Sequence, residues 1–165
     1  MKRQVPMTYS YMKRVISTNV EYSGALSSIR SQGRGCFSMT VRDLANEWID
    51  FAGRDIESAR FLLGMRPIPR EIICFHCQQC AEKAIKSILA FWDLEIPRIH
   101  ALAELASLVN SVKIVLIGLD AELANLTQFS ANIRYPPQKA PTDDDVHSAI
   151  AAAERVFSAV KTILG

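Results

Sequence analysis

Hydrophobic residues recur at helical spacing along the first part of the chain that has a regular pattern, residues 40–63. They fall three or four positions apart, which predicts one amphipathic helix with a single buried face. Thr40 and Asp43 have the spacing of a helix start signal, and Gly64 follows as a stop signal. The apolar positions are Val41, Leu44, Ala45, Trp48, Ile49, Ala52, Ile56, Ala59, Leu62 and Leu63.

A second regular pattern occupies the C-terminal end, where Thr142 and Asp145 are expected to cap the last helix. Its apolar stripe predicts a helix that continues to the end of the chain. Between the two patterns, further helices are predicted over residues 70–92, 100–109 and 120–133. The stripe of the last helix consists of Val146, Ile150, Ala153, Phe157, Val160 and Leu164.

The connections between these helices are short and contain prolines. Pro97 breaks the second connection, and Tyr135 before Pro136 ends the fourth helix, because a residue that precedes proline is driven out of the helical region. Residues 111–119 are β-branched and apolar, but no partner strand is predicted, so we interpret them as a loop or a helical extension. The sequence therefore predicts an all-α fold, an antiparallel up-and-down bundle of about five helices over residues 39–165.

The second predicted helix carries one polar stripe on an otherwise apolar surface. Its flanking positions are almost all apolar or cysteine, so this helix is expected to be buried on most sides. Polar groups on the remaining face then cost desolvation unless something uses them, which indicates a groove. A solvated face is the alternative interpretation. The stripe consists of His76, Gln79, Cys80, Lys83 and Ser87.

Two further groups at helix ends suit the same groove, His100 and the pair Arg134-Tyr135. Arginine pairs bidentately with phosphate, lysine supplies a point charge, tyrosine can stack on a base and histidine can donate or accept a hydrogen bond. Arg134 as a cation at a helix C-terminus and Tyr135 as a packed ring are the alternative roles. Glu82 lies outside the stripe and is expected to pair with Lys86. The candidate ligand-binding residues are His76, Gln79, Lys83, His100, Arg134 and Tyr135.

The spacing Cys74, Cys77, Cys80 resembles that of an iron–sulfur site but lies inside a predicted helix. A helix spreads these three sulfur atoms over an arc of about 120° instead of gathering them around one cluster. Cys36, the only other cysteine, lies far upstream. We therefore expect small, buried core residues, with no metal and no cofactor.

Composition and charge narrow the class of protein. Hydrophobic residues make up 49% of the chain, without the run of roughly 18 apolar residues that a membrane-spanning helix requires. Of the formal charge of +2, residues 1–38 carry +5, which leaves −3 for the rest and disfavours non-specific capture of nucleic acid. Residues 1–38 lack the apolar core of a secretory signal, so a cytoplasmic location is expected. We interpret them as a poorly ordered basic arm, with a nucleic-acid-binding arm as the alternative.

Four segments together resemble the HEPN domain family, the nucleotide-binding module of higher eukaryotes and prokaryotes. They are DIESARFLL at 55–63, FHCQQCAEKAIK at 75–86, PRIHAL at 97–102 and RYP at 134–136. The resemblance covers about residues 39–165. It implies an antiparallel helical bundle, frequent self-association and a common pairing with a minimal nucleotidyltransferase in two-gene toxin–antitoxin modules.

The resemblance also raises an enzymatic alternative, because many HEPN proteins are metal-independent ribonucleases with an Arg followed, after four to six residues, by a His. The next histidine after Arg134 is His147, which is too distant. Arg70 and His76 have five residues between them, but both lie in the second predicted helix, so we treat this match as accidental. We therefore expect a domain that binds a nucleotide or a nucleotidyltransferase partner, without assigned catalytic residues. An RNA-cleaving toxin is the first alternative, and a homo-oligomer that buries the polar stripe, without small ligand, is the second.

Overall fold

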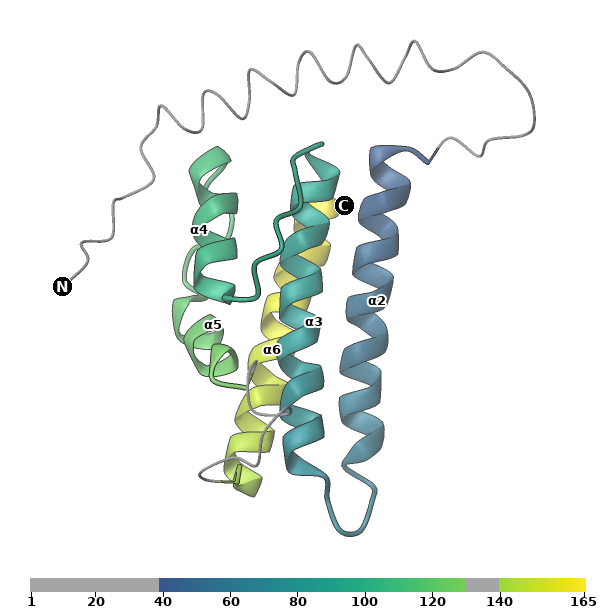
Figure 1. Cartoon of the computed structure of the whole chain (residues 1–165), viewed down its shortest axis with the longest axis vertical. Helices are drawn as coiled ribbons and strands as arrows, with labels where there is room; N and C mark the ends of the chain where they lie inside the picture. Colours follow the sequence, from purple (N-terminus) through teal and green to yellow (C-terminus); the bar gives the residue numbers. More distant parts are fainter. Residues whose placement is uncertain (1–38, 130–139) are drawn as a thin grey trace, which may run out of the picture. The chain divides into compact units, whose positions relative to one another are not determined.

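The computed structural model describes residues 39–129 and 140–165, and within these ranges it contains helices and no strand. The predicted all-α fold is thereby confirmed, with five helices in the described parts of the chain (Figure 1). The predicted arm over residues 1–38, Cys36, Arg134 and Tyr135 lie outside the described residues. The helices are α2 (Val41–Leu62), α3 (Arg70–Phe91), α4 (Leu102–Val112), α5 (Asp120–Thr127) and α6 (Asp143–Leu164).

Both predicted helix starts are confirmed as reciprocal capping boxes. The Thr40 hydroxyl accepts a hydrogen bond from the Asp43 N–H at 3.1 Å, and the Asp43 carboxylate accepts one from the Thr40 N–H at 2.9 Å. Thr142 and Asp145 repeat this arrangement at the start of α6, at 3.2 and 2.8 Å. Each box satisfies N–H groups that have no partner within the helix.

Helix α3 is the centre of the bundle, because it packs against all four of the other helices. Figure 1 shows α2 along one side of α3, α4 and α5 along the other, and α6 behind it. Its small and branched residues Ala81, Ala84 and Ile85 are completely buried, as the apolar flanks in the sequence predicted. A helix enclosed in this way has little room for polar side chains, so the few that it carries need partners.

The structure modifies two of the predicted boundaries. The third helix begins at Leu102 rather than His100, and it continues to Val112. The segment after it is a loop, and the N–H groups of Val115 and Leu116 in this loop donate to the Asn110 side chain of α4 at 3.1 and 2.9 Å. These bonds fix the turn that buries Leu116 in the core. Helix α5 ends at Thr127, and the predicted end at Ile133 lies outside the described residues.

The three cysteines of α3 are core residues, as predicted. Cys74, Cys77 and Cys80 are free thiols with no exposed surface. Burial raises the pKa of Cys74 and of Cys80 to about 12, and it raises the pKa of Cys77 as well. These thiols therefore stay protonated and pack as small apolar groups. In the described ranges no helix is long and apolar enough to cross a membrane.

Replacing Thr142 with alanine removes the side-chain acceptor of the second capping box. We expect Thr142→Ala to lower the free energy of unfolding by about 1 kcal/mol, measured by urea denaturation. Thr162→Ala is the matched control, because Thr162 lies near the end of α6 and its hydroxyl only donates to the Ser158 carbonyl within the helix. Equal stability of the two variants would contradict the assigned cap.

Candidate functional site

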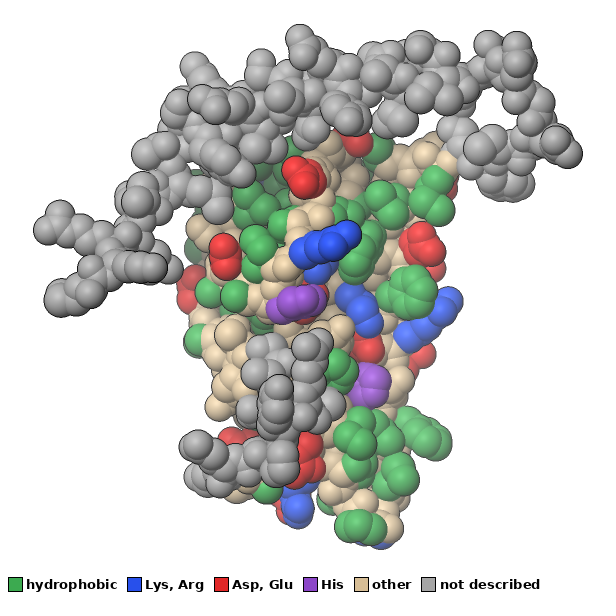
Figure 2. All heavy atoms as spheres, in the orientation of Figure 1, with side chains coloured by type: hydrophobic (Ala, Val, Ile, Leu, Met, Phe, Trp, Pro, Cys, Tyr) green, Lys and Arg blue, Asp and Glu red, His purple; other side chains and the backbone are tan. Residues whose placement is uncertain are grey.

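Polar side chains from α2, α3 and the connection before α4 meet along one side of α3. Figure 2 shows histidine and basic side chains close together over the middle of this face of the bundle. We call the group the polar seam. Two carboxylates organise it, one from α2 and one from α3 itself. The polar seam consists of Asp55, His76, Gln78, Gln79, Glu82, Lys83, Lys86 and His100.

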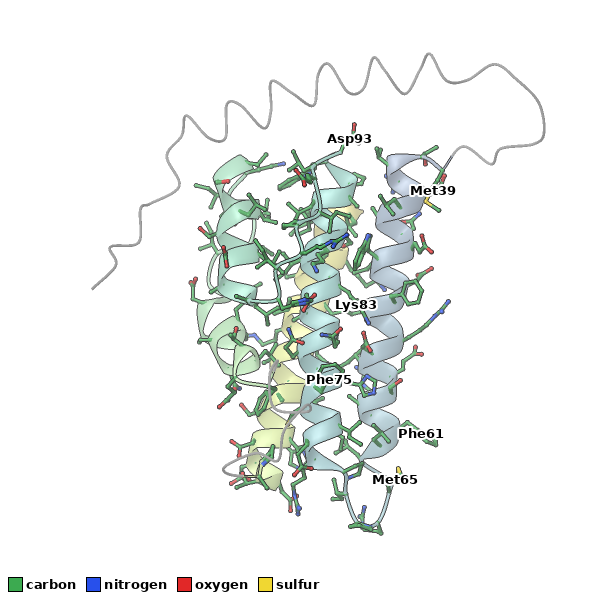
Figure 3. All side chains as sticks on the ribbon, in the orientation of Figure 1. Met39, Phe61, Met65, Phe75, Lys83 and Asp93 are labelled. Atoms are coloured by element: carbon green, nitrogen blue, oxygen red, sulfur yellow. The ribbon has the colours of Figure 1, made fainter. Side chains whose placement is uncertain are left out.

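Asp55 organises the half of the seam between α2 and α3. Asp55 is only 8% exposed, yet each of its two carboxylate oxygens contacts a side chain of α3. One oxygen lies 2.9 Å from Nδ1 of His76, and the other accepts a hydrogen bond from Nζ of Lys83 at 2.5 Å. Figure 3 shows Lys83 on the side of α3 that faces α2. Because His76 and Lys83 are two helical turns apart, one carboxylate of α2 fixes both side chains on α3.

Glu82 organises the other half, where α3 meets the connection to α4. One of its oxygens accepts a hydrogen bond from Lys86 at 2.8 Å and lies 3.0 Å from Nδ1 of His100. Its second oxygen accepts from Gln78 at 3.0 Å. Burial acts to raise the pKa of Glu82, but the hydrogen bonds from Lys86, Gln78 and His100 outweigh it and lower that pKa. Glu82 is therefore ionised at neutral pH inside the bundle.

Gln78 and Trp48 complete the surroundings of Glu82. The Gln78 amide also donates to the backbone carbonyl of His100 at 3.3 Å, and its own oxygen accepts from Gln79 at 2.7 Å. The Lys86 ammonium lies 5.7 Å from the centre of the Trp48 ring, which adds a cation–π contact to its ion pair. All polar groups around this buried carboxylate thus have a partner, as buried polar networks require.

The two imidazole rings differ in how far they reach the surface. The His76 side chain is 27% exposed, whereas the His100 side chain is 68% exposed. In each ring one nitrogen is held by a buried carboxylate, so the orientation of the ring is fixed while the rest of it remains accessible. A carboxylate that accepts from Nδ1–H leaves the other nitrogen free to accept a hydrogen bond or a proton.

Two depressions lie beside the polar seam on the α2 side. One, of about 430 Å³, is lined by Leu44, Glu47, Trp48, Phe51 and Lys83. The other, of about 510 Å³, is lined by Arg54, Glu57, Ser58, Phe61, Leu62 and His76. Both are open to solvent and largely apolar. Each depression contains one residue of the polar seam, Lys83 in the first and His76 in the second. Asp55 contacts both of these residues and therefore lies between the two depressions.

The structure brings together most of the predicted candidates, but in two groups. His76 and Lys83 share Asp55, whereas Gln79 and His100 belong to the hydrogen-bond network of Glu82. The predicted ion pair between Glu82 and Lys86 is confirmed. Ser87, on the same predicted stripe, is buried and donates to the Ala84 carbonyl within its own helix. The roles of Arg134 and Tyr135 remain predictions, because both residues lie outside the described ranges.

Sequence reasoning missed Asp55 and Gln78 as members of the site. A signal for Asp55 was present, because its neighbours on the helical face of α2, Ala52, Ile56 and Ala59, are all apolar. An acid among such neighbours is expected to have a partner inside the bundle. Gln78 gave no comparable signal, since its importance comes from reaching Glu82 and His100 at the same time.

The arrangement separates the Arg70 and His76 side chains, whose spacing matches the ribonuclease pattern on paper. Arg70 pairs with Asp143 of α6 at 2.6 Å, whereas His76 contacts Asp55 of α2. The two groups therefore face different helices and form no common site. Lys83 and Lys86 are each matched by a carboxylate, so a bound anion would have to compete with Asp55 or Glu82 for them.

These features define a helical-bundle protein with a polar seam on its central helix. The model of the HEPN domain matches residues 45–163, and the chain belongs to this family. It is 26% identical over 135 residues to a protein of Methanocaldococcus jannaschii named "Putative toxin MJ1304", covering 73% of this chain and 88% of the relative. The crystal structure of an archaeal HEPN homologue is similar, with a TM-score of 0.53 and 29% identity, over 73% of this chain and 98% of that one.

The Glu82 network predicts a specific dependence of stability on pH. Glu82→Gln leaves the Lys86 ammonium buried without its ion pair, and we expect a loss of about 3 kcal/mol at pH 7. The folded-state pKa of Glu82 is lowered from 4.5, so its contribution is present above pH 4.5 and is lost as the pH falls through the folded value. The difference between wild type and variant should therefore shrink in acid.

Urea denaturation of both proteins from neutral to acidic pH measures this difference. Glu95→Gln serves as the control, because it removes an exposed carboxyl group in the connection after α3. A gap between wild type and Glu82→Gln that stays constant down to low pH would show that Glu82 is not an ionised partner in the folded state.

Proposed function

We propose that this chain is a HEPN-type domain that binds a nucleotide or a minimal nucleotidyltransferase partner through the polar seam. In this proposal it is one component of a two-gene module of the toxin–antitoxin type. The observation that carries the proposal is the pair of carboxylate-held imidazoles, His76 of α3 on Asp55 and His100 of the connection before α4 on Glu82.

Preorganisation is the physical reason to assign recognition to this surface. Each ring is oriented by a buried acceptor, so little side-chain entropy is lost when a ligand forms a hydrogen bond to it. The adjacent depressions of about 430 and 510 Å³ lie within the size range of small-molecule sites and offer apolar walls to a base or sugar. His76, Gln79 and Tyr135 are assigned to the base or sugar, with His100 at the edge of the groove.

Phosphate is assigned to Lys83 and Arg134. Lys83 already donates to Asp55, so the nucleotide must offset part of that ion pair when it binds. This competition for Lys83 can be measured, because removing the negative charge of Asp55 should strengthen binding of the anion. The relative with the name "Putative toxin MJ1304" supports the assignment to a toxin–antitoxin-like module, in which a nucleotidyltransferase is the expected partner.

Nucleotide binding is tested by isothermal titration of the full chain with ATP and related nucleotides. We expect Lys83→Ala to weaken binding at least tenfold, because it removes the assigned phosphate contact. Asp55→Asn should strengthen binding about fivefold, taking roughly 1 kcal/mol for removal of one negative charge a few ångströms from the anion in a water-exposed site. Lys113→Ala, an exposed lysine in the loop after α4, is the matched charge control.

Circular dichroism of each variant establishes that the fold is retained before binding is compared. Two results would contradict the nucleotide proposal. One is the absence of heat with millimolar nucleotide, and the other is equal heat for wild type and Lys83→Ala.

The same carboxylate-held imidazoles favour a second candidate function, an RNA-cleaving toxin. A neutral ring whose Nδ1–H is held by a carboxylate can take the proton of a ribose 2′-hydroxyl through its other nitrogen. The 2′-oxygen then attacks the phosphorus, the bond to the 5′-oxygen breaks, and the departing 5′-oxygen takes up a proton. An arginine would stabilise the charge on the phosphorane, and Arg134 is the assigned residue.

Expression of the chain in a bacterial host separates this candidate from simple binding. If the chain is a toxin of this kind, growth should stop on induction, and His76→Ala or Arg134→Ala should restore growth at equal protein level. His147→Ala is the control, since His147 lies on an exposed position of α6. Harmless expression of the wild type, or arrest that persists in both variants, would count against the ribonuclease.

A further inference from the structure

Helices α5 and α6 form a further depression, of about 250 Å³, which the proposed function does not use. Figure 1 shows α5 on the side of α3 that is opposite to α2. No residue of the polar seam lines this depression. Its walls come from three alanines and from four polar residues, Glu122 and Asn125 of α5 and Ser148 and Arg155 of α6.

Glu122 carries a buried oxygen that has no partner. The residue is only 9% exposed. One carboxylate oxygen, Oε1, lies 2.5 Å from a guanidinium nitrogen of Arg155. The other, Oε2, is buried and has no hydrogen-bond partner among the described residues, and it is the only such side-chain atom in the described ranges. An unsatisfied buried acceptor costs free energy, so a ligand that donates to Oε2 removes this cost.

Arg155 leaves Oε2 unpaired although a guanidinium can satisfy both oxygens of a carboxylate. Bidentate pairing would use two parallel N–H groups, one for each oxygen. The ion pair instead joins Arg155 to Oε1, and the Arg155 side chain is 65% exposed, with no other ion pair in the described part of the chain. The pair therefore offers a free acceptor on Glu122 next to unused N–H donors on Arg155.

The remaining walls leave space in front of this pair. The Asn125 amide donates to the Ser148 hydroxyl at 2.7 Å, so the polar groups at the opposite wall are fixed. Ala121, Ala151 and Ala152 supply the apolar part of the lining, and their side chains are too small to fill it. The terminal torsion of a glutamate is soft, so Oε2 can turn toward the depression that Glu122 lines.

We propose that this depression binds a small uncharged molecule that carries a primary carboxamide. The amide N–H of the ligand donates to Oε2 of Glu122, and the amide oxygen accepts an N–H of Arg155. Both unused groups of the ion pair are then satisfied by one planar ligand group. The apolar body of the ligand lies against the three alanines, and the depression of about 250 Å³ suits a body as small as a single ring.

The charges of the site favour a neutral ligand. Glu122 and Arg155 are the only charged residues that line the depression, and their charges cancel. A cation would donate to Oε2 but would lie beside the guanidinium. An anion would pair with Arg155 but would place a second negative charge against Glu122 and leave Oε2 unsatisfied. A donor next to an acceptor on an uncharged group avoids both penalties.

This site goes beyond the proposed function, because it uses neither the polar seam nor a phosphate contact. Lys83 lines another depression, on the α2 side of the bundle. Binding of a carboxamide between α5 and α6 can therefore be measured independently of nucleotide binding.

The test is an NMR titration of the isotope-labelled full chain, followed through its backbone amide signals. The ligands are nicotinamide, nicotinate and picolylamine, which share one pyridine ring and are neutral, anionic and cationic at neutral pH. We expect nicotinamide at millimolar concentration to shift the signals of residues around the depression in a saturable way. Nicotinate and picolylamine should bind at least about tenfold more weakly, because each leaves a polar group of the site without its partner.

Two variants test the two parts of the site. Glu122→Gln should weaken nicotinamide binding at least about tenfold, since the amide nitrogen of glutamine cannot accept the ligand N–H. Ala151→Leu should abolish binding by filling the depression while the polar groups stay in place. Ala124→Leu is the matched control, because Ala124 is an exposed alanine of α5 that does not line the depression.

Three results would overturn the proposal: no saturable shift with nicotinamide, an equal response to either charged analogue, or wild-type affinity in either variant. The spectrum of each variant shows whether it is folded, and if one is not, the other decides. Lys83→Ala should bind nicotinamide as the wild type does. A chain that binds ATP but not nicotinamide contradicts this site alone, and the reverse result contradicts the proposed function alone.

Discussion

The pairing of two buried carboxylates with cations of α3 is the constraint on which the rest of the structure depends. Asp55 and Glu82 are 8% and 4% exposed, and each holds an ammonium and an imidazole. α3 is enclosed by four helices, so an unmatched lysine at the largely buried position of Lys86 would cost several kcal/mol of desolvation. The carboxylates therefore make it possible for a central helix to carry charged groups at all.

The same pairs connect the fold to the candidate site. Glu82 binds the His100 ring, and Gln78 binds both Glu82 and the His100 carbonyl, so the connection before α4 is fixed to the middle of α3. Asp55 does the equivalent for α2, because it holds two side chains two turns apart on α3. The polar groups that reach the surface are thus oriented by the contacts that hold α2 and the connection against α3.

The local features of this structure were predictable from the sequence, and the long-range ones were not. The capping boxes and the Glu82–Lys86 pair join residues three or four positions apart, so helical geometry alone determines them. The partner of Lys83 is Asp55, 28 residues upstream, and it is set by how α2 and α3 are rotated against each other. The start of α4 was misplaced for a similar reason: the contacts of His100 with α3 keep it in the connection, and the first helical bond forms from Leu105 to Ala101. Arg134 and Tyr135 are outside the described residues, so this part of the predicted site stays a prediction.

Helix α2 has one side that packs in the bundle and one side that is exposed, as the neighbouring residues Arg54 and Asp55 show. Asp55 points into the bundle and orients His76 of the polar seam, whereas Arg54 is exposed on α2, with its guanidinium 5.0 Å from the centre of the Phe51 ring. One helix thus contributes both the carboxylate that orients the seam and the exposed residues that line the two adjacent depressions. Because each depression also contains one residue of the seam, Lys83 or His76, the outer residues of α2 border the candidate site. The burial of Asp55 and the exposure of Arg54 follow from their different positions around α2, so one rotation of α2 against α3 sets both the inner contacts of the site and its outer border.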